Sequence, residues 1–353
     1  MFALCLLAQV GLLEPGLATA LAASRATSST AHAQTPRYEV VDLGVIQRIA
    51  ADIVPGLSAS GNIVIWRQEE SQAFSPVLYE GGTQKFLPKP EGYRNSFAYS
   101  VNDRGNSVGW SNTTLNPVDS TSTVHATFFT RDRAVDLGTL GGLRSQAYAI
   151  NNQGVIVGVS GLKDNKQCAF RYAEGKMICL NPLPKEIYSV AFDINSAGVV
   201  VGGFAMASTS AKPVEHAVLW RGDKPQDLGT LTGKGNSIAY AINNRDDVVG
   251  VSDLRSGETI FLYSHGKMTD LGIQGHAFAI NDQRQIVGTL TPEERGHPRG
   301  FLWESGTLYD INTLIPADTY RIEAAYRINN RGQILCSGFG KGSMHSLLLN
   351  PID

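Results

Sequence analysis

The sequence predicts an all-β protein: a seven-bladed β-propeller built of four-stranded blades. Three observations lead to this prediction. A motif of the form I-N-x-x-G recurs along the chain, its spacing is that of a propeller blade, and the residues between successive copies read as short strands separated by turns. The composition agrees, because 37 glycines and only 18% charged residues are typical of strands and turns.

The repeat is measured most easily from the Asn of the motif. Its positions are Asn102, Asn151, Asn195, Asn243, Asn281 and Asn329, at intervals of 38 to 49 residues, with Ser58 in the same place of the first repeat. Each interval holds a run such as AYAIN, a tight turn, a run such as VIVGVS, a variable loop, a run such as HAVLW, another tight turn and DLG. Four strands at a period in the forties are typical of a propeller blade.

Two columns of the repeat are explained by backbone geometry. Asn at the first position and Gly at the fourth are preferred in type I turns, although Asp246 and Arg284 replace this Gly in two repeats. A second Gly, four residues later, is expected where another backbone approaches closely, as wedge-shaped blades packed around an axis would require. This second column comprises Gly109, Gly158, Gly202, Gly250 and Gly288, with Ile65 and Cys336 as exceptions.

A third column pairs two residues 11 positions apart. The pairs are Ser75 and Phe86, His125 and Asp136, Cys168 and Cys179, His216 and Asp227, Thr259 and Asp270, and Arg299 and Asp310. A fixed separation across a hairpin indicates cross-strand neighbours, and an imidazole can donate to a carboxylate. His with Asp is also two thirds of a catalytic triad, but recurrence around a ring favours a role in fastening strands.

The two ends of the chain are predicted to meet in one blade. The last repeat has His345 but no following DLG, and the missing strand is found in YEVVDLG, from Tyr38 to Gly44, which contains Asp42. We expect this strand to pair beside HSLLLNP and to close the ring, which removes exposed sheet edges.

The third column also predicts a disulfide between Cys168 and Cys179. A turn of two or four residues at YAEGK would place the two side chains opposite each other, whereas a three-residue turn with a bulge would turn them to different faces. Cys336 takes the place of a closely packed Gly, so we expect it to be buried and free.

The N-terminus predicts export. Residues 1–33 are expected to be a signal peptide or a disordered N-terminus, and residues 34–353 a single propeller domain. The segment is rich in Ala and Leu and reaches Ala31-His32-Ala33, an A-x-A cleavage pattern, although Glu14-Pro15 interrupts the apolar run. No stretch of about 18 uninterrupted apolar residues is present. We therefore expect a secreted or periplasmic bacterial protein without membrane insertion.

The repeat resembles that of the HAF-repeat family of probable extracellular proteins. The resemblance rests on DLGTLGG at 136–142, DLGTLTG at 227–233, the A-I-N-x-x-G-x-I-V-G runs, and His-Ala at 125–126 and 216–217. It implies an exported bacterial repeat protein, and it supplies no catalytic residues. The sequence departs from the pattern where Cys168 and Arg299 replace His, and where DLG is lost at Phe86 and Cys179.

The favoured function is a non-catalytic binding or scaffold module. The long, irregular links emerge on one face of an up-and-down propeller, and this loop-rich face is expected to bind a glycan or a protein partner. Aromatic and guanidinium groups shortly before the first strands can stack on sugars or anchor a protein. These candidates are Tyr93, Arg94, Arg144, Lys185, Tyr188, Lys234, Tyr320 and Arg321.

The alternative function is an extracellular hydrolase or lyase. Glu293, Glu294 and His297 in PEERGHP offer acid, base or metal-ligand chemistry, but adjacent carboxylates in an extended segment point to opposite sides. The sequence contains no zinc, phosphate or calcium motif, so no catalytic residue, cofactor or metal is assigned. A net charge of -2 offers no broad basic field for nucleic acid. We expect a monomer that is more a binder than an enzyme.

Overall fold

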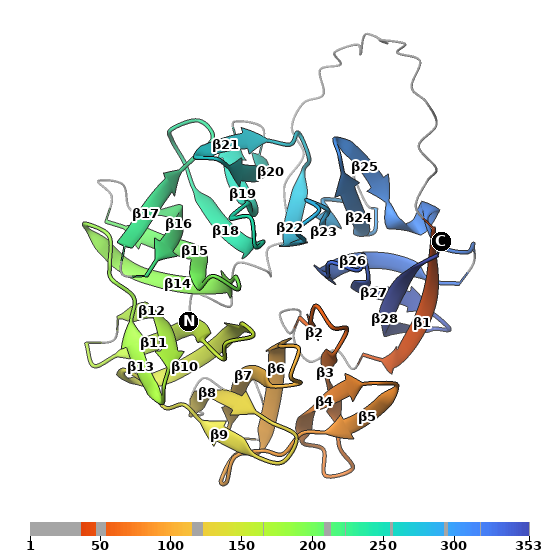
Figure 1. The fold of residues 1–353 in the computed structure, drawn as a ribbon, viewed down its shortest axis with the longest axis horizontal. Coiled ribbons are helices and arrows are strands. Elements are labelled where there is room, and N and C mark those ends of the chain that lie inside the picture. Colours follow the sequence, from red (N-terminus) through yellow and green to blue (C-terminus); the bar gives the residue numbers. More distant parts are fainter. Residues whose placement is uncertain are drawn as a thin grey trace.

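The computed structural model describes residues 37–46, 54–114, 123–164, 166–207, 213–222, 224–254, 257–292, 296–317 and 319–352. Within these ranges every element is a β-strand apart from one 3₁₀ helix, η1 (Ile311–Thr313). The strands form sheets arranged around a central axis (Figure 1), so the predicted all-β, propeller-type fold is confirmed. The predicted signal segment at residues 1–33, together with Glu293 and Glu294, lies outside the described residues.

Antiparallel pairing arranges the strands in groups of four, each a meander. Single parallel pairs, Arg144 with Val124 and Gln167 with Tyr188, also join three consecutive groups into one 12-stranded sheet. The first four groups are β2 (Gly56–Leu57), β3 (Ile63–Gln68), β4 (Phe74–Glu80) and β5 (Thr83–Phe86); β6 (Asn95–Val101), β7 (Ser107–Asn112), β8 (Val124–Phe129) and β9 (Ala134–Asp136); β10 (Gly141–Ile150), β11 (Ile156–Leu162), β12 (Gln167–Ala173) and β13 (Lys176–Cys179); and β14 (Glu186–Ile194), β15 (Val199–Met206), β16 (Val214–Arg221) and β17 (Lys224–Gly229).

The remaining groups follow the same order along the chain. They are β18 (Ser237–Ile242), β19 (Val248–Leu254), β20 (Gly257–Ser264) and β21 (Lys267–Asp270); β22 (Gly275–Ile280), β23 (Ile286–Leu290), β24 (Arg299–Glu304) and β25 (Thr307–Asp310); and β26 (Arg321–Ile328), β27 (Ile334–Gly340) and β28 (Ser343–Ile352) with β1 (Arg37–Val45). In each group the first strand lies nearest the axis and the fourth at the rim (Figure 1).

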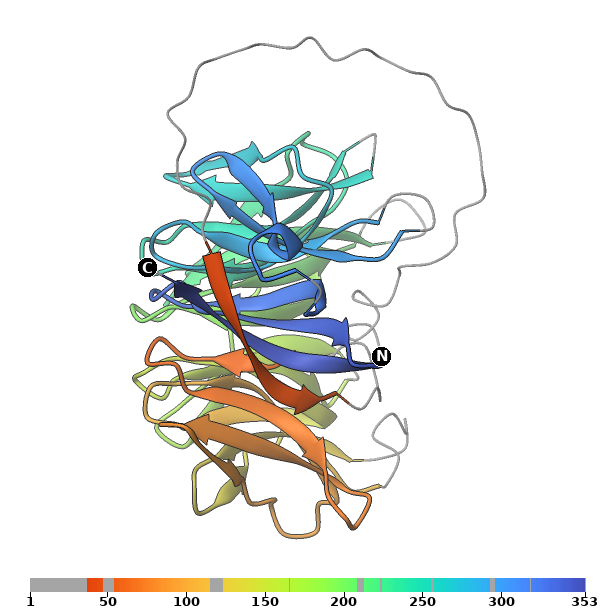
Figure 2. The ribbon, with the colours of Figure 1, turned by 90° about the vertical axis from the view of Figure 1, so that its right-hand side faces the viewer.

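The last group takes its outer strand from the opposite end of the chain. β1 pairs antiparallel with β28, and Val40 and Val41 lie opposite Leu349 and Leu348. Figure 2 shows the red β1 beside the dark blue strands. Tyr38 of β1 is buried in the same hydrophobic cluster as the inner residues of this group. The predicted pairing of the two chain ends is therefore confirmed.

The hydrophobic core is divided among the boundaries between neighbouring groups. At one boundary Val201 and Leu219 of β15 and β16 pack with Ala239 and Phe261 of β18 and β20. The second and third strands are covered on both faces, so they read as nearly continuous apolar runs. Polar and charged side chains are therefore found mainly at the strand ends, at the outer rim and on the surface around the axis.

The recurring Gly of the second strands lies close to another backbone segment, but this segment does not belong to a neighbouring blade as we expected. A Cβ at Gly158 would lie 2.0 Å from the carbonyl oxygen of Gln146, and a Cβ at Gly202 would lie 1.9 Å from that of Val190. Each carbonyl belongs to the first strand of the same sheet, so the expectation that a neighbouring blade supplies the contact is wrong. A β-bulge in the first strand, at Tyr148 in the third group, brings the carbonyl inward.

The predicted disulfide between Cys168 and Cys179 is present, with 5.9 Å between the two Cα atoms. The hairpin turns through two residues, Glu174 and Gly175, with φ angles of 53° and 77°, as in a type I′ turn. An even turn keeps both cysteines on one face, as expected. They are diagonal neighbours instead of direct opposites, because Cys179 lies opposite Phe170.

Cys336 is free and fully buried, as predicted. It lies opposite Ala325 in the register of β26 and β27, the place that Gly holds in other groups. Burial raises the pKa of its thiol, which leaves it a packing residue and not a reactive one.

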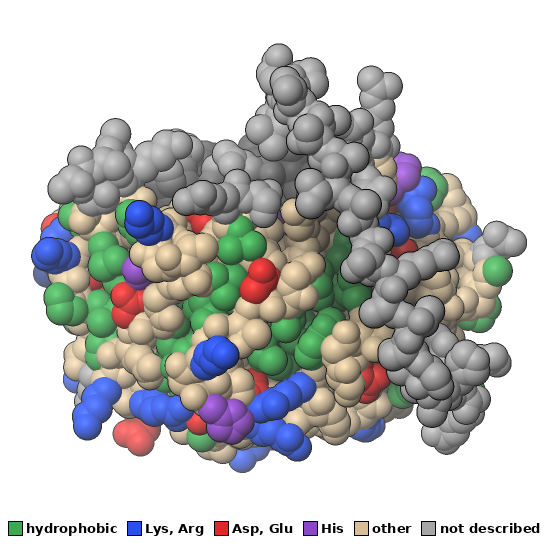
Figure 3. All heavy atoms as spheres, turned by 90° about the horizontal axis from the view of Figure 1, so that it is seen from above, with side chains coloured by type: hydrophobic (Ala, Val, Ile, Leu, Met, Phe, Trp, Pro, Cys, Tyr) green, Lys and Arg blue, Asp and Glu red, His purple; other side chains and the backbone are tan. Residues whose placement is uncertain are grey.

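The outer surface mixes side chains of different kinds. On the face in Figure 3, basic and acidic groups are interspersed with apolar ones, and Lys and Arg gather along the lower edge. Among the described residues, no helix has the length and apolar character needed to cross a membrane.

Candidate ligand site in the central channel

The tight turns at one end of the axis are linked by the Asn of the repeat. Within its own turn, Asn151 accepts hydrogen bonds from the backbone N–H of Gln153 (3.1 Å) and Val155 (3.0 Å) through Oδ1. Its Nδ2 donates to the backbone oxygen of Asn195 in the next group (3.2 Å). The expected turn chemistry is confirmed, and the same side chain also joins neighbouring groups.

This hydrogen-bonded belt continues from group to group. The further donor and acceptor pairs are Asn102 to Asn151, Asn195 to Asn243, Asn243 to Asn281, Asn281 to Asn329, and Asn329 to Ser58. Each bond gives a partner to a buried side-chain amide and to a buried backbone carbonyl. The recurrence of Asn in the sequence does not reveal these bonds between groups.

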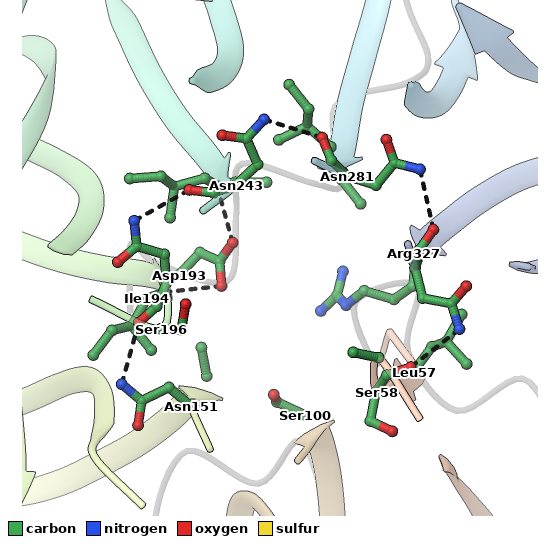
Figure 4. A pocket seen from close by; sticks show the side chains of 18 of the residues that line it. Leu57, Ser58, Ser100, Asn151, Asp193, Ile194, Ser196, Asn243, Asn281 and Arg327 are labelled. Carbon is green, nitrogen blue, oxygen red and sulfur yellow. Dashed lines mark hydrogen bonds between the residues drawn. The ribbon is translucent and has the colours of Figure 1, made fainter. Parts of the chain in front are cut away.

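The belt surrounds the mouth of a central pocket of about 240 Å³ (Figure 4). The groups line it with the last residues of their first strands, including the segments 148–152, 192–196, 240–244 and 278–282. All these strands run toward the turns, so the first residue of each segment lies deepest and the Asn lies at the mouth.

Aromatic rings form the inner end of the pocket. Each is the β-bulge residue of its first strand. Tyr148 and Phe192 have ring centroids 5.6 Å apart, as do Phe192 and Tyr240, and Phe278 completes the aromatic lining. A bulge re-aims one side chain, and here it delivers an aromatic ring to the axis in successive groups.

Two charged residues line the wall between the rings and the mouth. The position two residues before the Asn of the repeat (Ser58 in the first group) is small in most groups (Gly56, Ser100, Ala149, Ala241 and Ala279), but it is Asp193 in β14 and Arg327 in β26. Figure 4 shows the carboxylate and the guanidinium reaching into the pocket from opposite sides.

Neither charge forms a direct ion pair with another described residue. The Asp193 carboxylate accepts hydrogen bonds from the backbone N–H of Ile194 (2.8 Å) and Ile242 (3.0 Å). Arg327 donates through Nη1 to the backbone oxygen of Tyr326 (2.9 Å). No ion pair within 4.0 Å links either charge to another described group.

Burial perturbs both groups. It raises the pKa of Asp193 to about 6, against the opposing effects of the two backbone N–H groups and of Arg327. Burial also lowers the pKa of Arg327, which the Asp193 charge partly offsets. Poorly solvated charges of opposite sign that do not touch provide strong interaction sites for a molecule placed between them.

Three tyrosines expected to bind a ligand on the loop-rich face use their hydroxyls within the protein. Tyr93 donates to Asp136 (2.7 Å) and lies 2.8 Å from Nδ1 of His125. Tyr320 donates to Asp42 (2.7 Å), and Tyr188 to Glu215. The sequence placed these rings correctly before the first strands, but gave no sign of their internal partners.

The other loop-rich candidates do not converge on one site. Arg321 donates to Glu323 (2.7 Å), and its guanidinium carbon lies 5.4 Å from the centre of the Phe339 ring. Arg94, Lys185 and Lys234 are exposed in the links before β6, β14 and β18, and Arg144 is half-buried in β10. Of the alternative site, only His297 is described, and it is exposed.

The predicted His–Asp pairs are present across the outer hairpins. Nδ1 lies 2.8 Å from the carboxylate in His125 and Asp136, 2.9 Å in His216 and Asp227, and 2.9 Å in His345 and Asp42. The pairs lie on third and fourth strands, at the rim and away from the central pocket. This position agrees with a fastening role.

Sequence reasoning missed the two charged residues of the pocket. The signal was present: the runs read YSVN, YAIN, YAIN and FAIN in four repeats, but FDIN and YRIN where Asp193 and Arg327 stand. A charge that replaces a small residue in one column of a repeat is a departure that can be read from the sequence alone.

Comparison with known proteins supports the fold alone. No family model and no curated protein matches the chain. The β-propeller domain of the Trilobed protease from Pyrococcus furiosus, described as having an open velcro topology, is similar at 11% identity and a TM-score of 0.54, over 90% of this chain and 95% of that chain. A puromycin hydrolase is similar at 9% identity and a TM-score of 0.55, over 90% of this chain and 52% of that chain. This chain thus spans about half of the hydrolase.

Proposed function

We propose that this protein is an exported, monomeric, non-catalytic binding module that holds a small polar ligand in its central pocket. One observation carries the proposal: Asp193 and Arg327 reach into the pocket from opposite sides, and neither forms a direct ion pair with a described residue. Both residues are only partly exposed, and a poorly solvated charge without an ion-pair partner is costly. A bound molecule would provide that pairing.

The proposal includes a ring of seven blades. The four-stranded groups would be its blades, and β1 would close the ring as the outer strand of the last blade. Two contacts support closure: β1 pairs with β28, and the belt of Asn side chains runs from Asn329 back to Ser58. The resemblance to HAF-repeat proteins belongs to the same proposal.

Export is supported by the disulfide. Cys168 and Cys179 are bonded, and disulfides persist in oxidising compartments such as the bacterial periplasm or the extracellular medium. The proposed location is therefore secreted or periplasmic.

The loop-rich face remains a second place for a glycan or protein partner. It has less support than the pocket because the hydroxyls of Tyr93, Tyr188 and Tyr320 already bond to groups of the protein. The hydrolase or lyase alternative has support from His297 alone among the described residues, and an exposed imidazole without a partner group is a weak basis for catalysis.

A binding screen tests the proposed function. Residues 34–353 would be screened by thermal shift against small charged and neutral metabolites, and hits would be measured by calorimetry. We expect a hit whose affinity falls at least about tenfold in both Asp193→Ala and Arg327→Ala, a change that corresponds to about 1.4 kcal/mol.

Charge-matched controls are available away from the pocket. Asp164→Ala and Arg94→Ala remove the same charges from exposed positions, so they should leave the affinity unchanged. Equal losses of affinity in the control and pocket variants would contradict a ligand in the central pocket. So would ligands whose affinity changes in neither Asp193→Ala nor Arg327→Ala.

A further inference from the structure

The size of the pocket limits its ligand. Its volume of about 240 Å³ lies below the roughly 300–1,000 Å³ typical of sites for drug-sized ligands. A molecule the size of an amino acid or a single sugar can be enclosed, whereas an oligosaccharide or a peptide segment cannot.

The charges of the pocket wall favour a ligand without net charge. The wall provides one carboxylate, Asp193, and one guanidinium, Arg327. The further carboxylates in the lining, Asp103 and Asp282, lie in the turns at the mouth. There they link neighbouring groups by accepting hydrogen bonds from Ser60 and Asn152 and from Asn244 and Asn330 respectively, whereas Asp193 lies on the wall opposite Arg327. A simple anion would satisfy Arg327 but leave Asp193 unpaired, and a simple cation would do the reverse.

The aromatic rings beside Asp193 and the planar guanidinium of Arg327 favour different chemical groups at the two sides of the pocket. Asp193 follows Phe192, whose ring lies between those of Tyr148 and Tyr240 with centroid distances of 5.6 Å. A carboxylate beside aromatic rings favours an ammonium group, because the ring faces also attract a cation. On the other side, the planar guanidinium of Arg327 matches a carboxylate in a two-pronged contact.

We infer that the pocket binds a small zwitterion whose ammonium and carboxylate groups stand at the two ends of a short chain, the ammonium at Asp193 and the carboxylate at Arg327. This inference rests on the proposed function, since it names the class of ligand for the same pocket. Because the two protein charges form no direct ion pair, the ligand charges must also be separated.

A series of ω-amino acids tests this directly. Glycine, β-alanine, 4-aminobutyrate, 5-aminopentanoate and 6-aminohexanoate carry the same two charges at increasing separation. We expect calorimetry to give one best chain length, with affinity falling on either side. Single-charge analogues of the best length, the alkylamine and the alkyl carboxylate, should bind at least about tenfold more weakly.

Two variants assign the two ends. Asp193→Asn keeps the shape of the side chain and one oxygen acceptor, but it loses one of the two backbone N–H bonds, because these use Oδ1 and Oδ2 separately. It should bind the zwitterion no better than the matched carboxylate. Arg327→Gln should bind the zwitterion no better than the matched amine. Circular dichroism and melting temperature check that both variants are folded.

The failures of the two proposals differ. If single-charge analogues bind as well as the zwitterion, or if affinity does not depend on chain length, the zwitterion inference is overturned while the pocket remains a binding site. If the screen and the series both give no ligand that depends on Asp193 or Arg327, the proposed function fails as well.

Discussion

At the scale of single residues, two residues that replace the turn Gly of the repeat form ion pairs with neighbouring groups of strands. Asp246 and Arg284 stand where other turns have Gly, and both keep the left-handed backbone with φ angles of 63° and 61°. Asp246 pairs with Arg221 (2.8 Å), and Arg284 pairs with Asp247 (2.7 Å), whose side chain is only 1% exposed. The strain of a non-Gly residue at positive φ is thus accompanied by ion pairs with other strand groups.

The second-strand glycines give a prediction with a control in the next residue. Gly202→Ala should destabilise the protein by about 2–4 kcal/mol, because the added Cβ would lie 1.9 Å from the carbonyl oxygen of Val190 and backbone would have to move. Gly203→Ala should be nearly neutral, since its Cβ would meet Ile238 at an ordinary 3.7 Å. Urea unfolding measures both, and equal losses would contradict the bulge geometry.

Asp193 gives a prediction on pH. Because burial raises its pKa to about 6, the folded protein holds this proton more tightly than the unfolded chain, whose carboxyl titrates near 4. Its contribution to stability is therefore fully present below about pH 4 and is lost as the pH rises through 6. Relative to Asp193→Asn, the wild type should lose stability between pH 4 and 6.

Denaturant unfolding of both proteins at several pH values measures this difference, in which the effects of other groups cancel. A constant difference, or one of opposite sign, would show that the fold does not raise the pKa of Asp193.

At the scale of elements, the polar side chains of β1 fasten it to the C-terminal strands. Asp42 on β1 accepts hydrogen bonds from His345 and Tyr320, and these outweigh the effect of burial and hold its pKa far below the usual range. Lys341 also reaches the same carboxylate (3.2 Å). β1 is thus attached to the C-terminal strands by polar side chains as well as by its backbone ladder.

Deleting residues 38–44 should therefore destabilise the fold far more than deleting residues up to 35. The first deletion removes the backbone ladder to β28, buried Tyr38 and the Asp42 contacts. Melting temperatures of the two truncated proteins provide the comparison. Similar melting temperatures would mean that β1 does not close the fold.

The disulfide gives a second prediction at this scale. Replacing Cys168 and Cys179 by Ser should lower the free energy of unfolding by roughly 2–3 kcal/mol in the chain-entropy model for so short a loop. A reductant should have the same effect on the wild type and none on the double variant, because Cys336 is free and buried. A reductant effect that persists in the double variant would assign the stabilisation elsewhere.

At the scale of the whole molecule, the repeat predicted the propeller fold, the pairing of β1 with β28 and the disulfide, because each follows from periodicity and fixed separation. It could not predict which neighbour approaches Gly158, since a bulge is a property of paired strands. Nor could it predict the internal partners of Tyr93 and Tyr320, which come from distant segments. The central pocket was missed because Asp193 and Arg327 are far apart in the chain and meet only around the axis.

The most direct test of the central claim is hydrogen exchange with and without the best ligand. We predict protection of the pocket segments 192–196, 240–244 and 327–330, beginning with the N–H groups of Ile194 and Ile242 that hold Asp193. Protection confined to the loop-rich segments around Tyr188 and Lys234, with no change at Asp193 or Arg327, would contradict it.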